Sequence, residues 1–113
     1  MRHLVGYAVT VMIGLVVARL TLGPSGEGDP PFPHFDKVAH LLAFAALAFP
    51  LAAARAQSAA WIFSVGLLFG AAIEIIQPYV GRSAEWADLL ADALGLILGI
   101  ALGQLAARFL ANR

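Results

Sequence analysis

The stretch IEIIQPYVGRSAEWADLLADALG, from Ile73 to Gly95, decides the fold because it joins two apolar segments through a turn that carries charge. The apolar run before it ends at Pro78, which has no backbone N–H and ends a helix. The next run opens with Asp88 and Asp92, one helical turn apart. The stretch therefore predicts two antiparallel helices with carboxylates near the turn that joins them.

The rest of the chain repeats this apolar pattern. Of its 113 residues, 61% are hydrophobic and 12% are charged, and its mean hydropathy is +0.85. Four apolar segments run over residues 4–22, 38–54, 59–76 and 89–107. Each is close to the ~20 residues with which a helix crosses a ~30 Å hydrocarbon core, where lipid requires helical hydrogen bonding. The sequence predicts an all-α integral membrane protein, a four-helix transmembrane bundle formed by a single domain over residues 1–113.

Two alternatives to a bundle of four membrane-spanning helices are open. The segments could be buried helices of a soluble protein, but four in succession leave too little polar surface to coat a globule. The first segment could instead be a secretory signal peptide, because a basic start precedes an apolar run. It is long, carries Arg19 near its end and lacks a small-x-small cleavage site, so a retained helix is favoured.

Charge and residue types exclude several functions. A formal net charge of zero offers no basic surface, so nucleic acid is not expected as a partner. The chain has no cysteine, which excludes thiolate catalysis and zinc sites built on sulfur. No nucleotide-binding or zinc-protease motif is present. We therefore predict no cofactor and no metal site, and the lipid bilayer is the first expected partner.

The distribution of charge predicts an orientation. With four crossings, both termini and the link near Arg55 share one side, which carries four arginines and no acidic residue. The other side holds every Asp and Glu of the chain. Counting only Lys and Arg, as the positive-inside rule does, predicts that both termini are cytoplasmic. The turn after Pro78 would then face outward.

Small residues follow regular stripes on the last two predicted helices. On residues 89–107 the stripe of Gly95, Gly99 and Gly103 continues the face of the two aspartates, and Gly66 and Gly70 continue the face of Glu74 on residues 59–76. Spacing of this kind lets membrane helices approach closely. We predict glycine-mediated packing of these two helices against each other.

Polar residues are expected to converge at the outward end of the bundle. An ionisable side chain costs about 2.5–3.5 kcal/mol at the centre of an inserted helix, so several together require mutual pairing or a function. Arg82 is expected to pair with Glu74 or Asp88, because its donors suit a carboxylate. The candidate binding residues are Asp36, Lys37, His40, Glu74, Gln77, Arg82, Asp88 and Asp92.

The order of these residues resembles that of the VanZ-like family, small bacterial membrane proteins named for an accessory teicoplanin-resistance protein. The motifs are DKVAH (Asp36 to His40), IEIIQ (Ile73 to Gln77), GR (Gly81 and Arg82) and DLLADALGLILG (Asp88 to Gly99). One departure stands out, because Asp92 occupies the position where the family typically has Asn. This carboxylate adds acid beside Asp88 and Glu74.

The resemblance implies a multi-pass protein of the bacterial plasma (inner) membrane with a role at the cell envelope. Three function classes follow. The favoured one is a binding or accessory protein whose outward pocket engages a lipid-linked envelope molecule or a lipoglycopeptide antibiotic, as in teicoplanin resistance. The second is a small membrane enzyme in which His40 serves as general base or ligand, while Glu74, Asp88 and Asp92 hold a divalent cation or share a proton. The third is a proton-coupled transporter. A non-enzymatic role is favoured, and a homo-oligomer is kept as an alternative to a monomer.

Overall fold

The structure is a computed structural model that describes residues 2–24 and 29–112. Within these residues the chain folds into four long helices. They are α1 (Arg2–Leu22), α2 (Phe35–Ala54), α3 (Ala59–Ile76) and α4 (Trp86–Ala111). Two 3-10 turns, η1 (Ala56–Ser58) and η2 (Gln77–Val80), flank α3. No strand occurs within the described residues. The predicted all-α bundle is confirmed, and each helix is long and apolar enough to cross a membrane.

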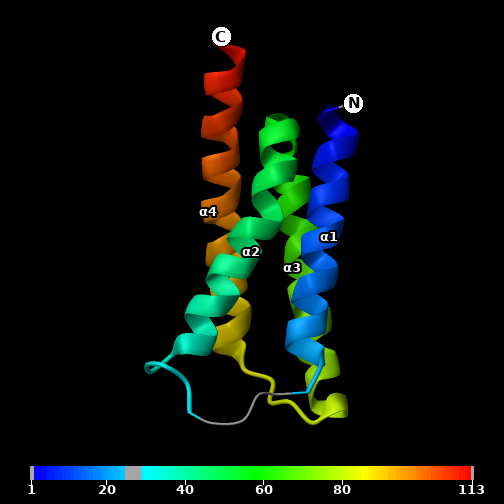
Figure 1. The fold of residues 1–113 in the computed structure, drawn as a ribbon, viewed down its shortest axis with the longest axis vertical. Coiled ribbons are helices and arrows are strands. Elements are labelled where there is room, and N and C mark those ends of the chain that lie inside the picture. The colour runs from blue at the N-terminus through cyan, green and yellow to red at the C-terminus, as the bar shows by residue number, and fades with distance from the viewer. Residues whose placement is uncertain (1, 25–28, 113) are drawn as a thin grey trace.

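The helices run up and down, so that the N- and C-terminal ends lie together at one end of the bundle (Figure 1). The connections from α1 to α2 and from α3 to α4 lie at the opposite end (Figure 1). Each predicted apolar segment lies within one helix, and α4 extends beyond its predicted segment at both ends. The helix includes Asp88 at its start because a carboxylate in the first turn complements the helix dipole.

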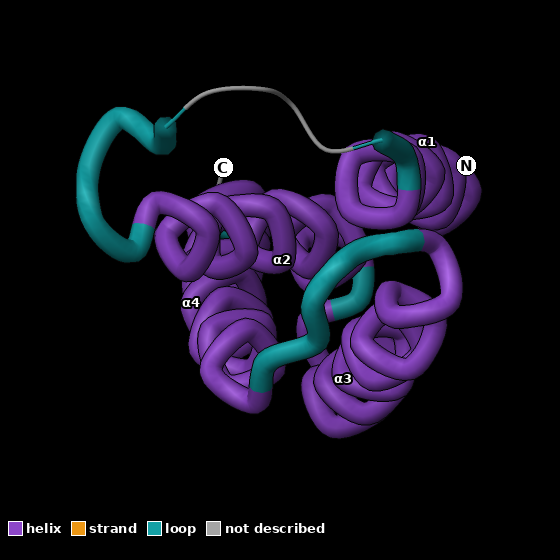
Figure 2. Tube along the Cα trace, turned by 90° about the horizontal axis from the view of Figure 1, so that it is seen from below, coloured by secondary structure: helices purple, strands orange, loops and turns teal. Residues whose placement is uncertain are grey.

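The closest packing in the bundle joins α2 and α4, through the glycines of α4. A Cβ atom placed on Gly95 would lie 2.2 Å from the carbonyl oxygen of Leu41. On Gly99 it would lie 2.3 Å from the carbonyl oxygen of Ala45. Side chains at these positions would collide with backbone, so only glycine permits this approach. Figure 2 shows α2 and α4 lying side by side.

The two predicted glycine stripes do not face each other: the α3 glycines lie against α4, as predicted, whereas the α4 glycines lie against α2. The α4 stripe contacts α2, whereas the α3 glycines face side chains instead of other glycines: Gly66 lies against Leu96, and Gly70 lies against Asp92 and Phe44. A stripe of small residues shows which face of a helix can be approached closely. It does not say which neighbouring helix fills that face, because several helices compete for it.

Helix α1 packs on α2 and α3, on the far side of the bundle from α4 (Figure 2). The Thr10 hydroxyl donates a hydrogen bond to the Leu47 carbonyl of α2 at 3.0 Å. At the end of the bundle near the termini, Arg55 donates to the Tyr7 hydroxyl at 2.9 Å. These contacts hold α1 against α2. The polar start of α4 therefore packs against α2 and α3.

Candidate functional site

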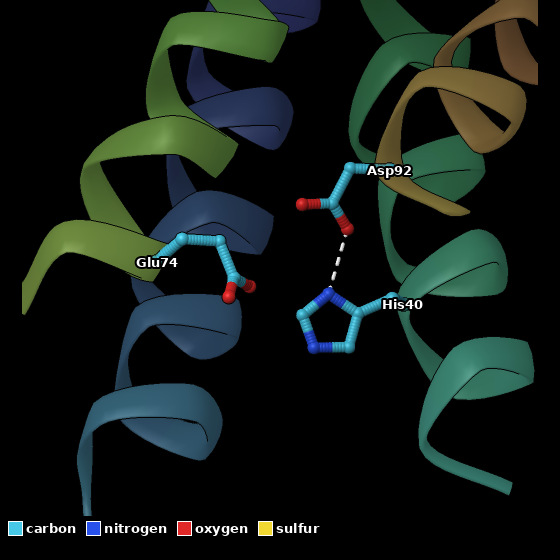
Figure 3. A group of neighbouring side chains, drawn as sticks. All are labelled: His40, Glu74 and Asp92. Carbon is cyan, nitrogen blue, oxygen red and sulfur yellow. Dashed lines mark hydrogen bonds and ion pairs between the residues drawn. The ribbon is translucent and has the colours of Figure 1, made fainter. Parts of the chain in front are cut away.

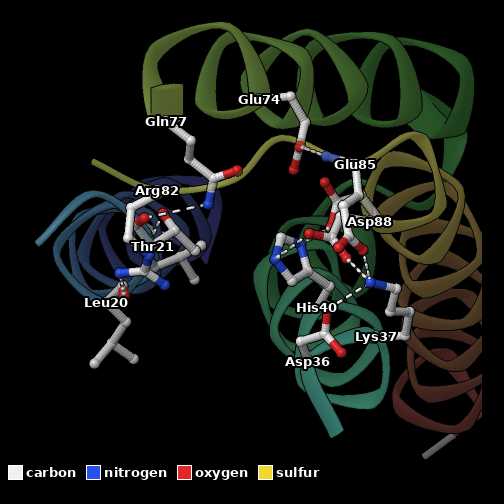
Figure 4. A network of polar contacts seen from close by, with 12 residues as sticks. Leu20, Thr21, Asp36, Lys37, His40, Glu74, Gln77, Arg82, Glu85 and Asp88 are labelled. Atoms are coloured by element: carbon white, nitrogen blue, oxygen red, sulfur yellow. Dashed lines mark hydrogen bonds and ion pairs between the residues drawn. The ribbon is translucent and has the colours of Figure 1, made fainter. Parts of the chain in front are cut away.

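The eight predicted site residues fall into two separate groups at the same end of the bundle (Figure 4). The larger group, which we call the acidic cluster, lies between the starts of α2 and α4 and the end of α3. The smaller group lies beside the end of α1 and contains Gln77 and Arg82. The acidic cluster consists of Asp36, Lys37, His40, Glu74, Asp88 and Asp92, joined by Glu85.

Lys37 links three carboxylates at the mouth of the acidic cluster. Its Nζ atom lies 2.5 Å from Asp36 Oδ2 and 3.1 Å from Asp88 Oδ1, and it also contacts Glu85. The contacts to Glu85 and Asp88 bridge the first turn of α2 to the start of α4, which the glycine packing brings together. One ammonium group thus offsets the charge of several carboxylates, one of which belongs to the buried Asp88.

Deeper in the bundle, His40 and Asp92 form a buried pair (Figure 3). His40 Nδ1 lies 2.7 Å from Asp92 Oδ1, and His40 Nε2 lies 3.7 Å from Asp88 Oδ2. Asp92 has 0% exposed surface, although it carries a carboxylate. Its second oxygen lies against Gly70, where a Cβ atom would be only 2.6 Å away. Gly70 therefore provides the space that Asp92 occupies.

Glu74 reaches the acidic cluster from the end of α3. One of its oxygens accepts a hydrogen bond of 2.9 Å from the backbone N–H of Glu85. The other, Oε1, is buried and has no hydrogen-bond partner within residues 2–24 and 29–112. In Figure 3 this carboxylate points toward His40. The hydrogen bond also fixes the connection that leads into α4.

A pocket of about 280 Å³ opens beside Glu74, between α3 and the start of α4. Its lining combines two carboxylates with apolar side chains. The lining residues are Ala71, Glu74, Ile75, Ala84, Glu85, Trp86 and Leu89. Trp86 is 86% exposed, so one wall of the pocket is open to its surroundings. We call this feature the α3–α4 pocket.

Gln77 and Arg82 do not join the acidic cluster. Gln77 donates to the Thr21 carbonyl at 3.2 Å, and Arg82 donates to the Gly23 carbonyl at 2.8 Å. The expected pairing of Arg82 with Glu74 or Asp88 is therefore wrong. The last carbonyl groups of a helix have no partner within it, and these two side chains supply donors to the end of α1.

Replacing Arg82 with glutamine should loosen the end of α1. A hydrogen bond from a charged group is worth about 1.5–3 kcal/mol, and partial exposure here lowers the expected loss to about 1 kcal/mol. Hydrogen exchange measured on the peptide over residues 17–24 should become faster. The matched control, Arg108→Gln at the other end of the bundle, should leave this peptide unchanged, and equal rates in both variants would contradict the role given to Arg82.

Glu85 is a residue of the acidic cluster that the sequence prediction did not include. It contacts Lys37 through its side chain and Glu74 through its backbone N–H. A signal was available, because Glu85 lies three residues before Asp88 at the start of the last helix, and both carboxylates reach Lys37.

Comparison with known proteins identifies the family to which the chain belongs. The profile of the VanZ/LLP1 family matches residues 5–107, nearly the whole chain. No match was found among curated proteins or among solved structures. The match spans all four helices and every residue of the acidic cluster. The chain therefore belongs to the VanZ/LLP1 family, as a membrane protein with four helices able to span the bilayer.

Proposed function

We propose that this protein binds a lipid-linked molecule of the cell envelope at the α3–α4 pocket. The observation that carries the proposal is the lining of that pocket, where Glu74 and Glu85 share one small space with Ile75 and Leu89. Carboxylates beside apolar side chains suit a molecule with a polar head and a hydrocarbon chain. The location at one end of the membrane-spanning helices favours the same kind of ligand.

Volume and charge narrow the class of ligand. Pockets for drug-sized molecules measure about 300–1,000 Å³, so about 280 Å³ admits a head group or part of a larger molecule. A whole glycopeptide antibiotic is too large to enter, and only a portion of it could bind. The two carboxylates accept hydrogen bonds, which favours a head rich in hydroxyl or ammonium donors, such as an amino sugar or an aminoacyl group.

The chain contains two tryptophans, and one of them is a built-in reporter for this binding. Trp86 lines the α3–α4 pocket, whereas Trp61 lies near the start of α3 at the other end of the bundle. Titrating a polyprenyl-linked amino sugar or teicoplanin into nanodisc-embedded protein should change the fluorescence of the Trp61→Phe variant. The Trp86→Phe variant should show no change.

Carboxylate variants test which groups hold the head. Glu74→Gln and Glu85→Gln should each weaken binding about tenfold, since a hydrogen bond to a charged group is worth about 1.5–3 kcal/mol. Asp29→Asn, in the loop before α2, is the matched control and should bind normally. Unchanged affinity in both pocket variants would reject the α3–α4 pocket as the binding site.

The proposal places the pocket outside a bacterial plasma membrane, with both termini in the cytoplasm. Single cysteines can test this in a chain that has none of its own. In intact cells an impermeant maleimide should label Ser83→Cys, beside the pocket, and not Gln57→Cys, near the termini. Labelling of Gln57→Cys alone would reverse the orientation and remove the envelope ligand from reach.

A small membrane enzyme is the second candidate, and the buried pair of His40 and Asp92 favours it. A histidine 2.7 Å from a carboxylate is the arrangement by which an imidazole is oriented for proton transfer. Mass spectrometry of the bound probe separates the two functions. Recovery of intact probe after long incubation supports binding, whereas conversion that is lost in His40→Gln supports the enzyme.

A further inference from the structure

We infer that His40, Glu74 and Asp92 form a binding site for a divalent metal ion (Figure 3). The three residues come from α2, α3 and α4, and each offers one ligand atom within 4.8 Å of the other two. Atoms that bind one ion at about 2.1 Å lie no more than about 4.2 Å apart. The three ligand atoms therefore lie within about 0.6 Å of the spacing that one ion requires.

Unsatisfied buried oxygens point into this site. Asp92 is fully buried, and its Oδ2 atom has no hydrogen-bond partner in the described part of the chain. Figure 3 shows this oxygen on the side of Asp92 that faces α3, which carries Glu74. Glu74 Oε1 is likewise buried without a partner among those residues. A cation bound between them would satisfy both oxygens at once.

The neighbouring acidic group provides a contrast. Asp36, Glu85 and Asp88 also lie close enough together to bind an ion. That position is already held by the Lys37 ammonium, which contacts all three carboxylates. Across residues 2–24 and 29–112, no lysine or arginine forms an ion pair with Glu74 or Asp92. Within that part of the chain, His40 is the ion-pair partner of Asp92 at the deeper site.

The ligand types indicate the class of ion. Imidazole nitrogen suits zinc and other transition metals, and carboxylate oxygen suits manganese and magnesium, so the mixed set favours Mn²⁺ or Zn²⁺. Three protein ligands leave coordination positions open, as in catalytic zinc sites. Asp88 Oδ2 lies 3.7 Å from His40 Nε2, near the outer nitrogen of the imidazole but beyond hydrogen-bond distance. The favoured interpretation of the sequence includes no metal site, and only its enzyme alternative lets Glu74, Asp88 and Asp92 hold a divalent cation, with His40 as base or ligand.

The inference goes beyond the proposed function and does not depend on it, because the ion alone is the probe. Full-length protein, purified in detergent through a tag without histidine and stripped with a chelator, would receive one equivalent of MnCl₂. Pulsed electron paramagnetic resonance should then detect ¹⁴N coupling from a coordinated imidazole. The chain has three histidines, so His40→Gln should remove the coupling while the double variant His3→Gln/His34→Gln keeps it.

Affinity measurements complete the test. Glu74→Gln and Asp92→Asn should each weaken Mn²⁺ binding by about 10–100-fold. Asp29→Asn, which changes an exposed carboxylate outside the acidic cluster, should change it less than twofold. Circular dichroism would establish that each variant remains helical, and Glu74→Gln alone suffices if the buried substitutions do not fold. Absence of ¹⁴N coupling in the unaltered chain, or its persistence in His40→Gln, would overturn the site. Failure of lipid binding with intact Mn²⁺ binding would reject only the proposed function.

Discussion

Alanine in place of Gly95 or Gly99 is expected to destabilise the bundle by about 1–3 kcal/mol, and by more if α2 cannot move. The added methyl group would lie 2.2 Å from the Leu41 carbonyl oxygen at Gly95 and 2.3 Å from the Ala45 carbonyl oxygen at Gly99. Backbone atoms cannot rotate away as a side chain can, so α2 and α4 must separate. Thermal unfolding in detergent, followed by circular dichroism, would measure the loss.

Gly14→Ala is the matched control for this experiment. Gly14 lies in α1, where a Cβ atom would meet Leu47 at 3.5 Å, an ordinary contact. Alanine favours a helix over glycine by about 1 kcal/mol, so this variant should be as stable as the original chain or more stable. If Gly95→Ala and Gly99→Ala were also stabilised, the close packing of α2 on α4 would be refuted.

Lys37→Gln is the second substitution with a large expected effect. Removing one partner of a buried ion pair costs about 3–5 kcal/mol, but Lys37 retains 23% of its side-chain exposure. Solvent screening reduces the expected loss to about 2 kcal/mol. The cost arises because Asp36, Glu85 and the buried Asp88 would repel one another without the ammonium group. Unfolding in urea or by heat would measure it.

Two companion variants give this prediction its specificity. Lys37→Arg keeps the charge and should recover much of the stability. The double variant Lys37→Gln/Asp88→Asn removes the buried charge together with its partner, so its loss should be smaller than the sum of the two single losses. Strictly additive losses would show that Lys37 and Asp88 do not interact.

The number of helices and their positions follow from the sequence. Each apolar segment is long enough to cross a bilayer, and backbone groups in lipid must be hydrogen-bonded within a helix. The depth of each polar residue along the bundle follows as well. Each residue adds a fixed rise along its helix, and successive helices run in opposite directions. The order of the segments is thus enough to assign His40, Glu74 and Asp92 to one end of the bundle.

Only the tertiary structure decided which side chains meet around the axis of the bundle. Arg82 and Glu74 lie near the same end, yet Arg82 bonds to carbonyl groups of α1 while Glu74 turns toward α4. The glycine stripe of α4 could have packed on either neighbour, and it packs on α2. Rise along a helix is a local property of the chain, whereas the direction in which a face points depends on how all four helices share the available surface. The sequence therefore determined the depth of the polar residues, and packing determined their partners.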